Sequence, residues 1–246
     1  MLTSIQHHEK TYKVDLSKPI DISLAVKVGG VKAWYVAEPT FEPVKMGDWI
    51  GDVKQGGSVN FRNIFFNPHG HGTHTECVGH ISAADYSVNN SLKQFHFIAQ
   101  LISVTPEEIN GDLIITKKIL EPFLENNSTD ALIIRTIENS LEKRNKNYSN
   151  TNPAFIDEAA MKYIIEKGIQ HLLLDTPSVD KEVDAGKLLA HRAFWQYPEH
   201  PDTSRTITEM IYVPNNIPDG LYLLNLQVAA FENDAAPSRP VLYSLI

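Results

Sequence analysis

The segment HGHGTHTECVGH, residues 69–80, carries four histidines and one glutamate within twelve residues. A divalent metal ion that activates water is bound by neutral imidazoles and carboxylates, with at least one coordination position left open. If the chain is extended from Thr73 to Glu76, the side chains of His74 and Glu76 project to the same side, because strand side chains alternate. The segment therefore predicts a metal site in which His74 and Glu76 bind one ion.

His80 follows Glu76 by four residues, beyond Gly79. The flexible chain at the glycine lets the imidazole return beside the metal without binding it, and imidazole titrates near neutral pH. We therefore predict that His80 is a general base. A single histidine in a loop is more often solvated or hydrogen-bonded to the backbone than catalytic. Four histidines within twelve residues make a functional site the better interpretation. Cys77 is interpreted as a packed small residue rather than a nucleophile.

The elements next to this segment predict where the histidines lie. The preceding stretch, SVNFRNIFF, is rich in strand-forming residues. After it come Pro68 and three glycines, at 70, 72 and 79, which exclude a regular helix. The histidines are therefore expected on a strand end or in a loop. Residues 45–58 have a loop composition that includes Trp49, so we expect Trp49 at a partner surface or a pocket rim.

Other segments indicate a sheet with helices in the same core. FIAQLISV and ALIIRT are short apolar runs typical of strands buried on both faces. IDEAAMKYIIEKGIQ has the acidic start, apolar spacing and late glycine of a helix, and it leads into the strand QHLLLD, a pattern that predicts an α/β protein. We also expect paired strands within residues 19–39, a helix over 181–198, strands at 206–213 and 220–231, and a flexible connection over 140–152.

The composition fits one soluble domain spanning residues 1–246, with 42% hydrophobic and 21% charged residues. A formal net charge of -8 and the lack of basic runs argue against a nucleic-acid partner. The first residues lack the apolar core of a secretory signal, and no apolar run approaches the roughly 20 residues that span a bilayer. We therefore expect no membrane association and a cytoplasmic location. The single cysteine excludes an intrachain disulfide.

The segment GTHTECVGH resembles the HxGTHxDxxxH signature of the cyclase family of metal-dependent hydrolases, which includes bacterial kynurenine formamidases and isatin hydrolases. The blocks ALIIRT, LLLDTPSVD, LLAHRAFW, TITEMIYVPNNIPDGLYLLNLQV and APSRPVLYSL are similar to later blocks of that family, so the resemblance covers the chain from Ile20 onward. It implies a swivelling β/β/α type of α/β fold, with a mixed sheet and flanking helices. It also implies a homodimer or homotetramer in which Trp49 and its loop cover a neighbouring subunit's site.

The resemblance extends to individual site residues. It implies that His74 is a metal ligand, that Glu76 takes the place of the family's bridging aspartate, and that His80 is the catalytic base. His191 in LLAHRAF and Glu209 in ITEMIYV match the histidine and the glutamate that complete the family's metal site.

One family ligand has no direct counterpart, because the position of the first ligand histidine is occupied by Gly70. Glycines at 70 and 72 let the backbone bulge, so either His69 or His71 could turn inward, and we favour His69. Glu76 is one methylene longer than aspartate, which would move the ions or reduce them to one. We therefore expect one or two divalent ions, and the mixed nitrogen and oxygen ligands favour Zn²⁺ or Mn²⁺.

The predicted function is hydrolysis of an amide, formamide or cyclic amide bond in a small-molecule substrate, with His80 accepting a proton from metal-activated water. Two alternatives are a non-hydrolytic metal-binding protein of the same fold, suggested by the glycine at 70, and a metal-dependent isomerase or dehydratase. Asp175 and Ser178 are assigned no catalytic role. Arg239 is expected either to contact substrate or to pair with an acidic neighbour.

Overall fold

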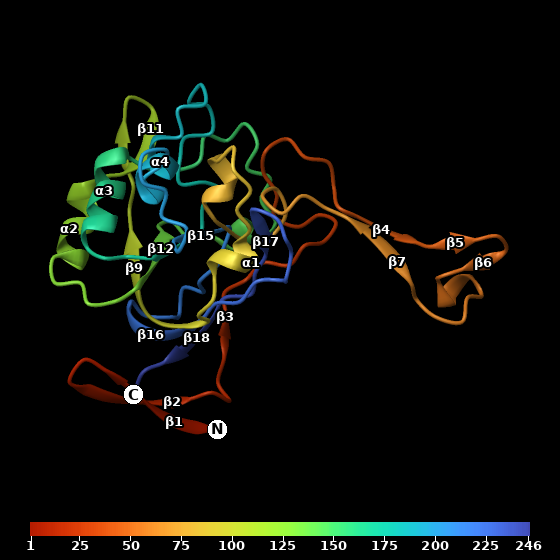
Figure 1. Ribbon diagram of the computed structural model, residues 1–246, viewed down its shortest axis with the longest axis horizontal. Helices are drawn as coiled ribbons and strands as arrows, with labels where there is room; N and C mark the ends of the chain where they lie inside the picture. Colours follow the sequence, from red (N-terminus) through yellow and green to blue (C-terminus); the bar gives the residue numbers. More distant parts are fainter.

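The computed structural model describes residues 1–246, and its centre is one curled, nine-stranded mixed sheet (Figure 1). The strand order is β17-β8-β15-β14-β12-β9-β16-β18-β3. The four middle strands β15, β14, β12 and β9 pair in parallel, and all the flanking pairs are antiparallel. The bounds are β3 (Ile20–Asp21), β8 (His74–Glu76), β9 (His96–Val104), β12 (Ala131–Thr136), β14 (His171–Leu174), β15 (Thr206–Glu209), β16 (Gly220–Asn225), β17 (Ala235–Pro237) and β18 (Val241–Ser244).

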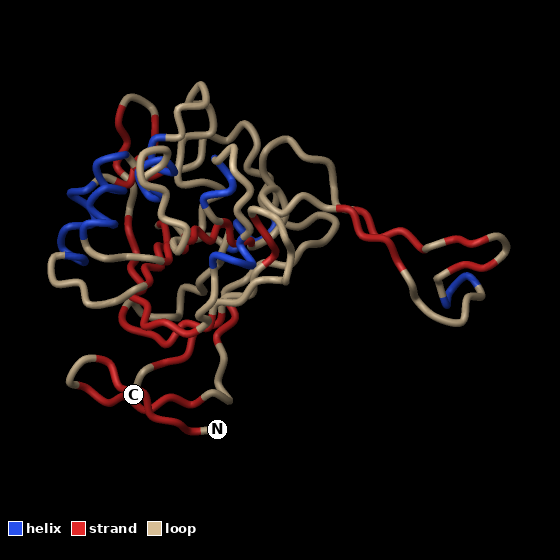
Figure 2. The backbone as a smooth tube through the Cα atoms, in the orientation of Figure 1, coloured by secondary structure: helices blue, strands red, loops and turns tan.

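Helices α2 (Lys117–Leu124), α3 (Glu158–Glu166) and α4 (Leu189–Trp195) pack against one side of this sheet (Figures 1 and 2). Within β12, Leu132 and Ile134 join the cluster on the helical side, whereas Ile133 belongs to the core on the opposite face. This alternation buries both faces of the central strands, as continuous apolar runs require. The predicted α/β class, with a mixed sheet and flanking helices, is confirmed.

Helix α3 shows how closely local sequence controls an element. The Asp157 carboxylate accepts a hydrogen bond from the Ala160 N–H at 2.6 Å, so it caps the helix start. Gly168 follows the helix in the left-handed region, with φ of 83°. The predicted helix and the following strand β14 are confirmed.

Shorter elements surround the sheet. They are the hairpin of β1 (Leu2–His7) and β2 (Lys10–Asp15), the small sheet of β10 (Glu107–Ile109), β11 (Asp112–Ile115) and β13 (Phe155–Ile156), the single turn α1 (Val88–Ser91), and the 3₁₀ helices η1 (Val53–Gln55), η2 (Val78–Ile81) and η3 (Leu141–Asn145). No helix in the chain combines the length and apolar character needed to cross a membrane.

A narrow hairpin arm projects from the body between residues 40 and 65 (Figures 1 and 2). Its stem pairs β4 (Thr40–Pro43) with β7 (Arg62–Phe65), and its tip pairs β5 (Lys45–Met46) with β6 (Trp49–Ile50). Trp49 is half-buried against Phe61 within the tip, with ring centroids 6.3 Å apart. The loop expected over residues 45–58 is thus a short hairpin followed by η1, and it stands away from the body.

Three sequence expectations differ from the structure. Residues 33–39 form a turn rather than a strand, because Trp34 and Tyr35 both have a φ of 60°. The helix expected over 181–198 begins only at Leu189, because the preceding chain turns around the Asp184 carboxylate, which accepts from the Leu188 N–H. The connection over 140–152 is folded, since the Lys143 ammonium donates to a buried carboxylate, that of Asp175, at 2.9 Å.

Gly72 governs how the chain enters strand β8. Its φ is 67°, and a Cβ built there would lie 2.8 Å from the Leu24 carbonyl oxygen. Immediately after it, the Thr73 N–H donates to the same oxygen at 2.9 Å, and the Thr73 hydroxyl donates to the Met210 carbonyl at 2.6 Å. The glycine is therefore needed both for its backbone conformation and for the close approach of residue 24.

We expect Gly72→Ala to destabilise the protein more than Gly111→Ala, as measured by urea unfolding. Gly111 has a comparable φ of 85° but open space around its Cβ position, so its substitution isolates the backbone strain of about 1 kcal/mol. Gly72→Ala adds a steric conflict with backbone atoms, and we expect at least twice that loss. Equal losses would mean that the neighbouring chain relaxes and that the close approach is unimportant.

Candidate metal centre

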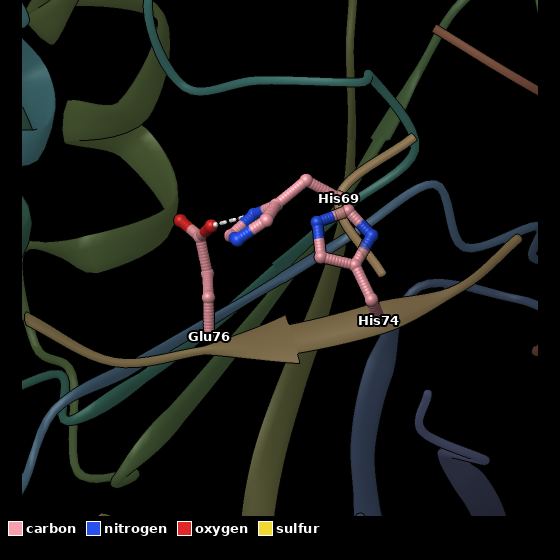
Figure 3. A group of neighbouring side chains, drawn as sticks. All are labelled: His69, His74 and Glu76. Atoms are coloured by element: carbon pink, nitrogen blue, oxygen red, sulfur yellow. Dashed lines mark ion pairs between the residues drawn. The ribbon is translucent and has the colours of Figure 1, made fainter. Parts of the chain in front are cut away.

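Strand β8 places His74 and Glu76 on one side of the sheet, as the alternation of strand side chains predicts (Figure 3). β8 lies between β15 and β17, and Glu209 of β15 is directly opposite His74. The His74 Nε2 atom lies 3.4 Å from the Glu209 Oε2 atom. All three side chains are buried, so two carboxylates and an imidazole are removed from water in one place.

His69 reaches the same place from the loop before β8 (Figure 3). Its Nδ1 atom lies 2.9 Å from the Glu76 Oε2 atom, and its Nε2 atom lies 2.7 Å from the Asp234 Oδ2 atom. Both ring nitrogens of His71 contact backbone groups outside the cluster. Its Nδ1 atom accepts a hydrogen bond from the Asn67 N–H at 2.9 Å, and its Nε2 atom lies 2.7 Å from the Ala37 carbonyl oxygen. Of the two histidines that flank Gly70, only His69 faces the centre.

The glycine at 70 is itself required by packing. A Cβ at this position would lie 2.8 Å from Cγ2 and 3.0 Å from Cγ1 of Val36. A side chain at residue 70 would therefore require the Val36 side chain to move.

His191 enters from the first turn of α4. Its Nε2 atom lies 3.2 Å from Glu76 Oε1, and its Nδ1 atom lies 2.6 Å from Asp180 Oδ2. The Asp180 carboxylate also accepts from the backbone N–H groups of Ala190 and His191, at 2.8 and 3.1 Å. One aspartate therefore fixes the helix start and the ring that projects from it.

His80 occupies the open side of the cluster. It lies in η2, with Nε2 3.9 Å from Glu76 Oε2 and Nδ1 3.5 Å from Asp234 Oδ2. Its side chain is 32% exposed, compared with 0% for His74 and 3% for His191. His80 is thus the histidine of the cluster most accessible to an incoming molecule.

Two carboxylates in this cluster were not predicted from the sequence. Asp180 belongs to the block DTPSVD, and its signal would have been its place before the helix that carries His191. Asp234 lies in a stretch, FENDAAP, that carries no motif. Sequence reasoning had no means of finding Asp234, because it meets His69 only through folding.

The charges of the cluster depend on one another. Burial would lower the pKa of His69, but the neighbouring Asp234 and Glu76 carboxylates raise it to about 10. Burial would likewise lower the pKa of His191, which Asp180 and Glu76 raise to about 10. Burial would raise the pKa of Glu76, yet His80 and His191 hold it well below its usual value. The pKa of Glu209 is raised, first by burial and then by the charge of Glu76.

The donor atoms fit a divalent cation. His74 Nε2 and Glu76 Oε2 are both buried, and neither has a hydrogen-bond partner, although His69 and Glu209 lie close to them. Ligand atoms of His69, His74 and Glu76 lie within 4.8 Å of one another, and so do those of Glu76, His80 and His191. Because unpaired buried polar atoms are rare, a cation that accepts both lone pairs would satisfy them.

The remaining residues singled out in the sequence lie outside the cluster. Asp175 is buried and accepts from the backbone N–H and the hydroxyl of Thr136, both at 2.9 Å. The Ser178 hydroxyl accepts from the Asp180 N–H at 3.0 Å. Arg239 is exposed, and its Nε atom lies 2.8 Å from the Asp21 Oδ2 atom. Of the two roles expected for Arg239, the structure therefore shows the pairing with an acidic neighbour. Cys77 is buried beside Tyr86.

Comparisons with solved structures support the same fold at low identity. A predicted metal-dependent hydrolase from Bacillus stearothermophilus has 18% identity and a TM-score of 0.66, with 92% of this chain and 98% of that chain covered. Isatin hydrolase A from Labrenzia aggregata has 12% identity and a TM-score of 0.65, with 93% and 94% covered. Isatin hydrolase A from Ralstonia solanacearum has 12% identity and a TM-score of 0.65, with 92% and 91% covered.

A search of the curated proteins finds no match. The family model described as "Putative cyclase" matches residues 14–181, which include strand β8, His69 and His80, although His191, Glu209 and Asp234 lie beyond the matched range. The match covers well over half of the 246 residues. The chain therefore belongs to the cyclase family.

Proposed function

We propose that this protein is a metal-dependent hydrolase that cleaves a carbon–nitrogen bond in an amide, formamide or cyclic amide of low molecular weight. The observation that carries the proposal is the pair of buried atoms His74 Nε2 and Glu76 Oε2, neither of which forms a hydrogen bond of good geometry, in one cluster with an exposed histidine. A purely structural metal site is closed on all sides, whereas a catalytic one keeps an open position.

Five side chains would hold one or two divalent ions, Zn²⁺ or Mn²⁺, as their nitrogen and oxygen donors favour. These are His69, His74, Glu76, His191 and Glu209. When bound, the ion lowers the pKa of water and polarises a substrate carbonyl. Glu76 contacts both His69 and His191, so its carboxylate would be the donor that these two histidines have in common.

His80 is placed to accept the proton. It is exposed on the open side of the cluster. Its Nε2 atom lies 3.9 Å from the Glu76 carboxylate, which His69 and His191 also contact. A carboxylate oxygen of Asp234 lies 3.5 Å from its Nδ1 atom, so the ring can hold its Nδ1 proton against a charge while Nε2 accepts another. His80 then returns that proton to the leaving nitrogen.

The family's solved members favour this reaction class over others. Several of the similar structures are named as isatin hydrolases or metal-dependent hydrolases, and one was solved with the product analogue thioisatinate. At identities of 11–18% these names do not transfer a substrate. The chemistry of the centre supports hydrolysis, and the amide, formamide or cyclic amide class is proposed from the resemblance to the family.

We expect the purified protein to contain divalent metal and to lose turnover when a chelator removes it. His80→Ala should retain the metal content and lower kcat by about 10²–10⁴-fold, because general-base catalysis contributes that range. His200→Ala, at an exposed histidine whose side chain takes part in none of the cluster's contacts, is the matched control and should change neither property. Elemental analysis and hydrolysis of formamides, lactams and lactones provide the two measurements.

Three outcomes would contradict this function. Metal-free protein with full, chelator-insensitive hydrolysis would remove the metal from the mechanism. Metal-loaded protein without turnover on any of these compounds would indicate a non-hydrolytic binding protein. Deuterium incorporated from solvent into recovered substrate, without cleavage, would identify an isomerase or dehydratase.

We further propose that the hairpin arm joins this chain to a second copy, giving a homodimer or homotetramer. A two-stranded hairpin is marginally stable alone, so an arm of this length needs a surface to pack against. It exposes six large apolar side chains, namely Met46, Val53, Val59, Phe61, Ile64 and Phe65. Such a concentration is typical of a protein–protein contact.

We expect Phe65→Glu to shift the protein toward the monomer in sedimentation velocity, because a charge would be placed in the contact. Phe65 is 77% exposed in the single chain. Leu141, 69% exposed on the body, supplies the matched control, and Leu141→Glu should leave the oligomer intact. A wild-type protein that sediments as a monomer would overturn the proposal.

A further inference from the structure

Two histidines of the metal centre share an arrangement in which the ring spans between Glu76 and an outer carboxylate. His191 has Glu76 at 3.2 Å on one nitrogen and Asp180 at 2.6 Å on the other. His69 has Glu76 at 2.9 Å and Asp234 at 2.7 Å. The nitrogens are exchanged, since the inward atom is Nε2 in His191 and Nδ1 in His69.

Asp234 is held in place by backbone contacts with the segment that carries the centre. Its carbonyl accepts from the Cys77 N–H at 3.0 Å, directly after Glu76. The Asn233 carbonyl accepts from the Val88 N–H at 2.9 Å. On the other side, a Cβ at Gly79 would lie 3.0 Å from the Asp234 Cβ, so the glycine leaves room for this approach. The backbone position of Asp234 therefore does not depend on the two histidines.

The same carboxylate faces both histidines of the open side. Asp234 Oδ2 lies 2.7 Å from His69 Nε2 and 3.5 Å from His80 Nδ1. The two rings stack with centroids 4.2 Å apart and planes inclined by 30°. The shorter contact makes His69 the primary partner of Asp234.

We propose that Asp234 is a positioning residue that makes His69 a metal ligand, in place of the histidine that the family carries at the position of Gly70. The inference rests on the proposed function, since it concerns the same centre. A carboxylate behind a ligand histidine holds a proton on the outer nitrogen and thereby presents the inner lone pair to the ion. Here the proton would be on Nε2, and Nδ1 would face the centre.

The test compares metal affinity in the full-length protein, using competition between Zn²⁺ or Mn²⁺ and a chromogenic chelator. Asp234→Asn should weaken affinity by about 10–100-fold, the usual effect of losing such a partner. The visible spectrum of the Co²⁺-loaded protein should change, because the His69 ring is released. Asp202→Asn is the matched control: its side chain is 27% exposed against 26% for Asp234, and it pairs with Arg205 outside the centre.

A double-mutant cycle tests whether Asp234 acts through His69. If it does, His69→Ala and the combined His69→Ala/Asp234→Asn variant should bind metal equally weakly. Additive losses in the combined variant would overturn the inference. The inference would also be overturned if the wild type binds metal and Asp234→Asn has the same metal affinity and the same Co²⁺ spectrum. That result would not contradict the proposed hydrolase function. A wild type that binds no divalent metal would instead reject the proposed function itself.

Discussion

Burying the Glu76 carboxylate costs several kcal/mol unless cationic or hydrogen-bonding groups replace the water it loses. The side chain is about 1% exposed, and Glu209 nearby is about 4% exposed, so two carboxylates share one desolvated region. Burial and then the charge of Glu76 raise the pKa of Glu209, whereas the neighbouring histidines hold the pKa of Glu76 well below its usual value although burial would raise it. Histidines of the segment 69–80 and of helix α4 supply part of the compensation, and a divalent cation would supply the remainder.

The backbone meets this constraint through a strand of only three residues. β8 is short, but it is paired on both edges, by β15 and β17, so its side-chain directions are fixed. His74 and Glu76 face the centre, whereas Thr75 between them faces away and shares a 2.7 Å hydrogen bond with Thr208 of β15. Because register and alternation are coupled, a slip by one residue would turn Thr75 inward and both His74 and Glu76 outward.

The sequence predicted most of this centre, for different physical reasons at different residues. Alternation within an extended segment was sufficient to place His74 and Glu76 together. His191 and Glu209 came only from the family resemblance, because contacts between distant segments leave no periodic trace in one sequence. The choice between His69 and His71 required the loop geometry, since Val36 packs against Gly70 and the ring nitrogens of His71 are bonded to backbone groups. The central strands were predicted by their apolar runs. The arm was not, because the composition of residues 45–58 indicated a loop and one sequence does not show that its short strands pair away from the body.

Exposure divides the centre into a closed and an open half. His74, Glu76, His191 and Glu209 form the closed half, whereas His69, His80 and Asp234 have side chains between 19% and 32% exposed. The segments that bring His69 and Asp234 also carry Phe66 and Phe231, whose ring centroids are 6.2 Å apart. An incoming molecule would therefore meet the His80 imidazole, which is 32% exposed, before it reached the buried carboxylates of Glu76 and Glu209. A site used only to stabilise the fold would gain nothing from this asymmetry, because any opening admits water to the ligands. A hydrolase needs such an opening, since both water and substrate must enter beside the proton acceptor.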